Sequence, residues 1–267
     1  LEARLGTRLL NRTTRRVSLT HDGEALLERA RTLVADAEDI EQQFRPTDGA
    51  LSGRLKIDVP SRIARRLIAP ALPDFFAQHP AIELELGSTD RTVDLVHEGI
   101  DCALRVGPLA SSSLVARPLG RFTLINCASP AYVARHGMPT TPGELAQHIA
   151  VHYVSPTNGR VAPWEWLRDD GEHVAVPMRG QVTANNAEAY IACALAGLGL
   201  IQIPRFDVQD HLADGSLVEV LPQARAEAMA VHLVYPHRRH PSRRLQALTG
   251  WLAALLAPYL DGAPLKR

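Results

Sequence analysis

Apolar and polar positions repeat with different periods in two parts of the chain. Across residues 21–45 the apolar positions alternate steps of four and three, which is the spacing of a coiled-coil seam. The pattern predicts one long helix that Thr20 caps and that ends at the break beginning with Pro46. The alternative is an amphipathic helix on its own core, but small alanines on the seam favour close pairing with a second copy. The seam positions are Leu26, Ala30, Leu33, Ala37, Ile40 and Phe44.

After this break, short β-rich runs alternate with helical stretches. Such alternation predicts an α/β domain built from βαβ units. The predicted strands cover residues 55–59, 82–86, 101–106, 199–203 and 231–235. The predicted helices cover residues 62–77, 92–97, 186–196 and 242–256.

The composition sets limits on the class of protein. A chain of 267 residues with 46 % hydrophobic and 22 % charged residues suits one large two-lobed domain with an appendage. No uncharged apolar run approaches the roughly 18 residues of a membrane span, so we expect no membrane partner. Residues 1–6 lack the residue order of a secretory signal, and the three cysteines form no CxxC pair. We therefore expect a cytoplasmic protein without a thiolate metal site.

Charge is unevenly distributed although the formal net charge is zero. Residues 1–20 carry five arginines against one glutamate, whereas residues 21–45 carry three arginines against seven carboxylates. A basic segment of this kind suits contacts with DNA phosphates. A run this short is equally typical of a solvated face, so charge alone leaves both interpretations open.

An ordered set of residues in the basic segment resembles the signature of the LysR-type transcriptional regulators. The set consists of Leu1-Glu2, Leu5-Gly6, Leu9-Leu10, Arg12, Arg15-Arg16, Leu19-Thr20 and Gly23. In that family these positions run from the end of the recognition helix through the wing hairpin into the linker helix, where the coiled-coil pattern lies. The resemblance continues through Leu67-Ile68-Ala69-Pro70, residues 99–107 and residues 196–200, and it covers essentially the whole chain.

The resemblance implies an α/β fold with a periplasmic-binding-protein-like (type 2) bilobed effector domain, preceded by a winged helix-turn-helix remnant and a long linker helix. The implied segments are residues 1–20 for the remnant, 21–46 for the linker helix and 54–260 for the effector domain. Lobe I would hold about 54–126 and 229–260, and lobe II about 127–228. The resemblance further implies promoter DNA as a partner of the complete protein, and a homodimer or homotetramer.

The family pattern begins ahead of residue 1, so we expect an N-terminal truncation within the winged helix-turn-helix. Base readout needs a recognition helix in the major groove, whereas phosphate contacts only position a protein on DNA. We therefore interpret Arg12, Arg15 and Arg16 as phosphate contacts of the wing and not as determinants of sequence specificity.

Candidate effector contacts follow predicted strands, where helix N-termini offer unpaired N–H groups. Small polar side chains occupy these places, and the family resemblance implies effector contacts there; they are Ser61, Ser88, Thr89, Asn185 and Asn186. The alternative for each is simple helix capping. Arg105, at a strand end, is either a counter-charge for the effector or part of a structural ion pair. We expect a small anionic effector.

The sequence gives little support for an enzyme. The glycines in 197–199 precede a strand and do not follow one, so they indicate a turn and not a nucleotide-binding loop. No GxSxG motif and no metal-ligand spacing is present, and we expect no enzyme activity, no metal and no cofactor. A solute-binding protein of the same fold, without DNA binding, is the alternative function. The arginine-rich segment and seam helix, where an exported receptor would carry its signal, favour the regulator.

Overall fold

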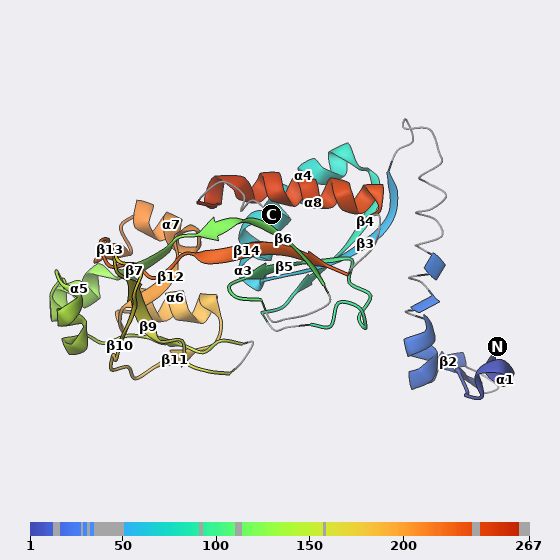
Figure 1. Cartoon of the computed structure of the whole chain (residues 1–267), viewed down its shortest axis with the longest axis horizontal. Coiled ribbons are helices and arrows are strands. Elements are labelled where there is room, and N and C mark those ends of the chain that lie inside the picture. The colour runs from blue at the N-terminus through green and yellow to red at the C-terminus, as the bar shows by residue number, and fades with distance from the viewer. Residues whose placement is uncertain are drawn as a thin grey trace.

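The computed structural model describes residues 1–12, 17–27, 29–30, 33–34, 51–90, 93–109, 114–156, 159–236 and 241–261. A small N-terminal unit precedes a larger domain of two lobes (Figure 1). The N-terminal unit contains α1 (Glu2–Leu5) and an antiparallel hairpin of β1 (Leu10–Arg12) and β2 (Val17–Leu19). Residues 21–27, 29–30 and 33–34 are helical. Glycine is required at position 23, because a Cβ atom there would lie 2.0 Å from the carbonyl oxygen of Leu9.

Lobe I is built on a five-stranded sheet with the order β4-β3-β5-β14-β6. Its strands are β3 (Ser52–Val59), β4 (Ala81–Ser88), β5 (Cys102–Val106), β6 (Val115–Phe122) and β14 (Met229–Tyr235). The first strand, β3, runs parallel to β4 and β5, whereas β14 runs antiparallel to β5 and β6. The late strand β14 thus returns to complete a sheet that earlier strands began.

A helical stretch follows β3 directly. It comprises α3 (Ser61–Ile63), the π-helical turn η1 (Ala64–Ile68) and α4 (Ala69–Gln78). The long helix α8 (Arg243–Leu256) lies beside α4 along the sheet and continues into the short η3 (Ala257–Tyr259) (Figure 1). Phe75 of α4 and Trp251 of α8 have ring centroids 5.0 Å apart. Apolar residues of α8 at helical spacing enter the core of lobe I; they are Leu245, Leu248, Leu252 and Leu256.

Lobe II contains a three-stranded antiparallel sheet in the order β12-β7-β13. Its strands are β7 (Leu124–Ala128), β12 (Ile201–Pro204) and β13 (Val218–Val220). The helical elements of this lobe are α5 (Pro130–His136), the 3-10 helix η2 (Pro142–Gln147), α6 (Ala187–Leu195) and α7 (Arg205–Ala213). Two small strand pairs complete it, β8 (His152–Tyr153) with β11 (Thr183–Ala184) and β9 (Trp164–Leu167) with β10 (His173–Val176).

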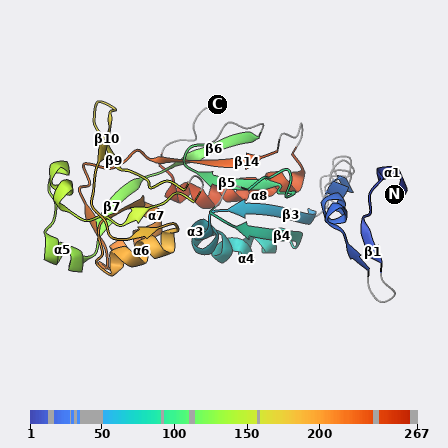
Figure 2. The same cartoon turned by 90° about the horizontal axis from the view of Figure 1, so that it is seen from below.

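The chain crosses between the lobes twice, once between β6 and β7 and once between β13 and β14. Figure 2 shows the lobes side by side, with α6 and α7 of lobe II near α3 of lobe I. Phe206 in the first turn of α7 packs against Phe122 of β6, with ring centroids 4.3 Å apart. The start of α7 is therefore anchored in the core of lobe I.

The short helix predicted over residues 92–97 is wrong for the described part of that range. Residues 95–99 form turns, because Asp94 Oδ1 accepts hydrogen bonds from the N–H groups of Val96 and His97, both at 3.0 Å. Such local side-chain bonds compete with helical backbone bonds. Gly99 then adopts a positive φ of 63°, which ends the turn.

None of the described helices combines the length and the apolar composition needed to cross a lipid bilayer.

Candidate functional site

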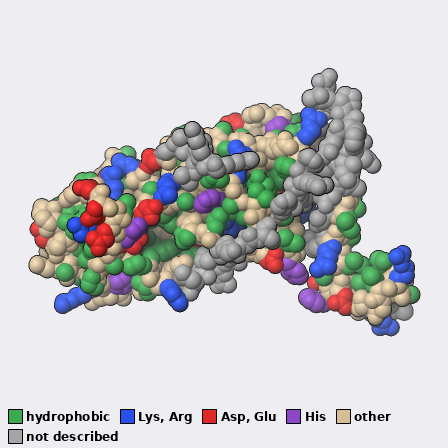
Figure 3. Space-filling view, in the orientation of Figure 1, with side chains coloured by type: hydrophobic (Ala, Val, Ile, Leu, Met, Phe, Trp, Pro, Cys, Tyr) green, Lys and Arg blue, Asp and Glu red, His purple; other side chains and the backbone are tan. Residues whose placement is uncertain are grey.

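A cleft with a volume of about 990 Å³ lies between the two lobes. Figure 3 shows hydrophobic side chains at the surface where the lobes meet, with charged side chains beside them. Both lobes line the cleft with polar residues that bear on its chemistry; they are Thr89, Asp90 and Arg105 from lobe I and Tyr153, Trp164 and Gln202 from lobe II. The volume is near the upper end of the range of about 300–1,000 Å³ for small-molecule sites.

Ser61 begins α3, and its polar groups are directed at Asp90. Its N–H donates to Asp90 Oδ1 at 3.0 Å, and its hydroxyl donates to Oδ2 at 2.8 Å. The contact exists because β3 and β4 are parallel neighbours, so that Val59 and Ser88 are in register at the strand ends. The protein's own carboxylate therefore occupies the helix start at which we expected the effector.

Arg105 at the end of β5 forms a salt bridge with Asp58 of β3, with Nη1 and Oδ2 2.7 Å apart. Burial raises the pKa of Asp58, while the guanidinium of Arg105 counteracts that effect. The structural ion pair, one of the two sequence interpretations of Arg105, is thus present. Arg105 also lines the cleft, and its buried Nη2 has no hydrogen-bond partner among the described residues.

The other predicted contacts differ in their positions. Thr89 lines the cleft, whereas Ser88, Asn185 and Asn186 are not among the residues that line it. Asn186 caps α6, since its side chain accepts a hydrogen bond of 2.9 Å from the N–H of Ala189. In this structure the side chain of Asn186 is therefore a helix cap, which is the alternative that the sequence left open for it.

An ion-pair network joins the lobes beside the cleft, and sequence analysis missed it. Arg62 of α3 is buried, and its Nε lies 2.8 Å from Asp207 Oδ1 of α7. Its Nη1 lies 2.6 Å from Glu188 Oε2 of α6. Burial raises the pKa of Asp207 to about 7, and Arg62 opposes this. Because Arg62 shares its guanidinium between Asp207 and Glu188, it does not fully offset the cost of burying the charge of Asp207.

Lobe II supplies polar groups from β12, which corresponds to the strand predicted over 199–203, and from β8 and β9, which the sequence did not predict. Gln202 Nε2 donates to Asn126 Oδ1 and to the carbonyl of Glu165, both at 2.8 Å, and is held in place. Burial raises the pKa of Tyr153 to about 12, so its hydroxyl stays protonated at neutral pH. Trp164 is 7 % exposed, and its Nε1 has no partner among the described residues.

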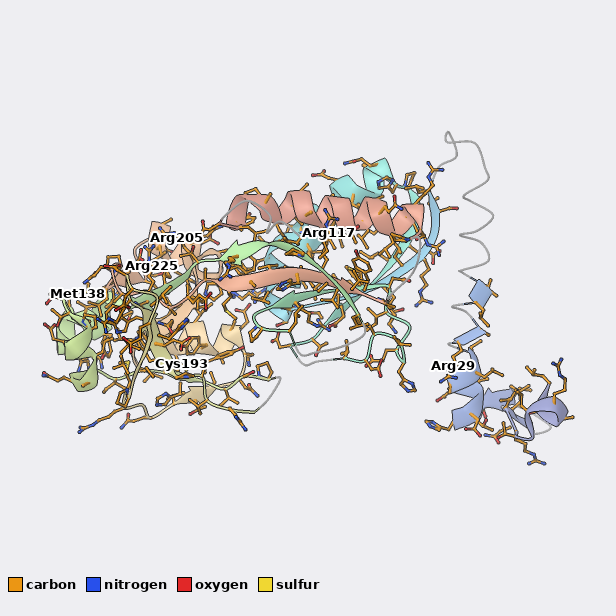
Figure 4. All side chains as sticks on the ribbon, viewed as in Figure 1. Arg29, Arg117, Met138, Cys193, Arg205 and Arg225 are labelled. Atoms are coloured by element: carbon orange, nitrogen blue, oxygen red, sulfur yellow. The ribbon has the colours of Figure 1, made fainter. Side chains whose placement is uncertain are left out.

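Two arginines of lobe II that do not line the cleft stabilise the lobe. Arg205 and Arg225, labelled in Figure 4, both form salt bridges with Glu219 of β13. The Arg205 salt bridge fixes the start of α7 to the sheet of lobe II. Nothing in their geometry suggests ligand binding.

The predicted seam and wing residues are described only in part. Leu26 is half-buried, Ala30 is exposed and Leu33 is 70 % exposed. The backbone of Arg12 lies in β1. The remaining residues, Arg15, Arg16, Ala37, Ile40 and Phe44, lie outside the described part of the chain.

Two α/β lobes with a cleft between them, behind an N-terminal hairpin and helix, define a small-molecule-binding domain with an appended unit. The model of the LysR substrate binding domain matches residues 48–257. The chain is 43 % identical to the HTH-type transcriptional regulator YhjC of Escherichia coli K12, over 98 % of this chain and 87 % of that protein. It is 37 % identical to the HTH-type transcriptional repressor PA14_22550 of Pseudomonas aeruginosa, over 96 % and 81 % of the two chains.

The structure of CrgA, a LysR-type transcriptional regulator from Neisseria meningitidis, superposes with a TM-score of 0.66 at 28 % identity, over 97 % of this chain and 86 % of that one. The chain therefore belongs to the LysR family of transcriptional regulators. The family assignment and the expected two-lobed, periplasmic-binding-protein-like fold are confirmed. The relatives are regulators, which decides between the two functions left open by the sequence.

Proposed function

We propose that this regulator senses a small molecule in the cleft between its lobes and that occupancy of the cleft changes its action on DNA. The proposal rests on one observation, which is that residues of both lobes line the same cavity. A ligand that contacts both lobes favours the arrangement of the lobes that it binds more tightly, and the shift is set by the difference between its affinities for the two arrangements. Lobe movement is thereby coupled to binding.

Two of the expected contacts are well placed for this role. Thr89 and Arg105 line the cleft, and we assign them to direct effector contact. Ser61 acts indirectly, since it holds Asp90, which lines the cleft. These residues bind the effector and have no catalytic role in the proposal.

The N-terminal unit supplies the other half of the function. In the proposal Arg12, Arg15 and Arg16 contact DNA phosphates, where arginines add affinity without sequence preference. The helix of residues 21–46 pairs with its copy in a second chain, which gives a dimer or a tetramer in the cytoplasm. The 70 % exposure of Leu33 in the single chain supports this, because pairing would cover it.

A variant that fills the cleft tests the proposal. Ala162 is exposed and lines the cleft, so Ala162→Trp reduces the cavity with little effect on the core. Ala131→Trp, on the exposed side of α5 and outside the cleft, is the matched control. A panel of cellular metabolites is screened by thermal shift against the unmodified protein.

We expect Ala162→Trp to abolish the shifts and Ala131→Trp to retain them. Each compound that shifts the melting temperature should also change DNA binding by the protein in a mobility-shift assay. Compounds that act equally on both variants would show that the effector binds outside the cleft.

A further inference from the structure

We infer that the effector is an uncharged, mainly apolar molecule whose oxygen atoms accept hydrogen bonds from Trp164 and Arg105, such as a ketone, quinone, ester or lactone. This inference rests on the proposed function of the cleft, and it replaces the expectation of an anionic effector. Four features of the described residues support it.

The first feature is the occupied helix start. The N–H and hydroxyl groups of Ser61 would be the natural ligands of an effector carboxylate at this place. Both donate to Asp90, at 3.0 Å and 2.8 Å. An anionic effector would have to displace that carboxylate or lie beside it, and like charges close together repel each other. A neutral molecule meets neither obstacle.

The second feature is the charge of the lining. Among the described residues the cleft is lined by three arginines against four carboxylates, so it offers an anion no excess of positive charge. Each arginine is also engaged in an ion pair. Arg62 pairs with Asp207 and Arg105 with Asp58, and Arg121 forms a salt bridge of 2.6 Å with Glu227. The distribution of charge gives no preference for an anion.

The third feature is a pair of buried hydrogen-bond donors. The indole Nε1 of Trp164 and the Nη2 of Arg105 are buried, and neither has a partner among the described residues. Trp164 is more than nine-tenths buried and lines the cleft. Buried polar groups without partners are costly, and an indole or guanidinium nitrogen can only donate. Both groups therefore call for acceptor atoms, which argues against a cationic effector.

The fourth feature is the apolar remainder of the lining. It is contributed by both lobes and includes Val106, Leu124, Val161, Ile203, Phe206 and Met229. An apolar ligand body is stabilised by removal of these surfaces from water. An apolar skeleton that carries acceptor oxygens therefore complements both the apolar lining and the donors of Trp164 and Arg105.

Three probes with one naphthalene skeleton test the charge preference. They are 2-acetonaphthone, which is a neutral ketone, 2-naphthoate, which is an anion, and 2-naphthylmethylammonium, which is a cation. Isothermal titration on the full chain should give an affinity for the ketone at least about tenfold above either ion. The lining arginines are already paired and so do not compensate the desolvated carboxylate of naphthoate, and the ammonium group cannot accept the hydrogen bonds that Trp164 and Arg105 offer. This arm needs no substitution and so does not depend on the folding of a variant.

A matched pair of substitutions tests the donor. Trp164→Phe removes the indole N–H in the cleft, and Trp166→Phe makes the same change two residues along β9 outside the cleft lining. Loss of one neutral hydrogen bond should weaken ketone binding roughly two- to tenfold in the first variant. Affinity should be unchanged in the second. Circular dichroism verifies that both variants are folded.

The outcomes separate the inference from the proposed function. Tighter binding of naphthoate or of the ammonium probe, or equal affinity in the two tryptophan variants, overturns the ligand class but leaves the cleft as the effector site. Ketone binding that Ala162→Trp does not affect overturns the proposed function together with the inference. Binding of none of the probes at millimolar concentration also overturns the ligand class.

Discussion

Replacing Arg62 by methionine should destabilise the protein far more than the same change at Arg65. Arg62 bridges the lobes by ion pairs with Asp207 and Glu188, and the Arg62 and Asp207 side chains are 7 % and 6 % exposed. Removing one partner of such a buried pair leaves an uncompensated charge and costs about 3–5 kcal/mol. Arg65 is 73 % exposed in its pair with Glu188, and a pair of this kind contributes about 0–1 kcal/mol.

The penalty for Arg62→Met should depend on pH. Burial raises the pKa of Asp207 from 3.8 to about 7 in the folded protein, with Arg62 opposing. Because the folded pKa exceeds the unfolded one, this group's contribution to stability falls as the pH rises from about 4 to about 7, by up to about 4 kcal/mol. At pH 5 Asp207 carries a proton and is neutral, so the loss of Arg62 lowers the free energy of unfolding by less. At pH 8 the carboxylate is ionised and loses its partner, so the penalty is larger.

Urea unfolding followed by circular dichroism measures these differences. We expect a large loss of stability for Arg62→Met at pH 8, a smaller loss at pH 5, and little change for Arg65→Met at either pH. The double variant Arg62→Met/Asp207→Leu should recover part of the loss, because an apolar pair can replace a buried ion pair. Equal effects of the two single substitutions, or a penalty independent of pH, would refute the reasoning.

Three further predictions concern association, DNA and the cleft. Leu33→Asp should shift the protein toward monomer in light scattering, because it places an unpaired charge on the proposed seam; an unmodified protein that is monomeric at micromolar concentration would contradict the pairing. Replacing Arg12, Arg15 and Arg16 by alanine should weaken binding to all DNA sequences equally and reduce the salt slope by roughly 0.9 per lost phosphate contact, whereas a sequence-dependent loss would point to base readout. Ser61→Ala should lower stability by about 1.5–3 kcal/mol, since its hydroxyl donates to a carboxylate, and should change affinity for 2-acetonaphthone less than twofold; the reverse result would make Ser61 a direct contact.

Several elements could be predicted from sequence because local periodicity reports which positions are buried. The strand predicted over 231–235 is part of Met229–Tyr235, and the helix predicted over 242–256 corresponds to Arg243–Leu256. The ordered family residues likewise indicated the LysR family, which the comparisons confirm. Periodicity failed where a polar side chain binds its own backbone, as Asp94 does in the turn that replaced a predicted helix. It also gave no signal for the short strands β8 to β11 and β13 of lobe II, although it did predict β12.

The composition of the cleft was decided by tertiary structure. Ser61 could be placed at a helix start from the sequence, but its partner Asp90 lies 29 residues away and reaches it only because two parallel strands end side by side. Arg62 and Asp207 are separated by 145 residues, and only the return of α7 to lobe I brings them together. Sequence determined which groups can donate, accept or carry charge. The partners that satisfy those groups, and the donors of Trp164 and Arg105 that are left without one, depend on how distant segments pack, because hydrogen bonds and ion pairs act over a few ångströms of space and not along the chain.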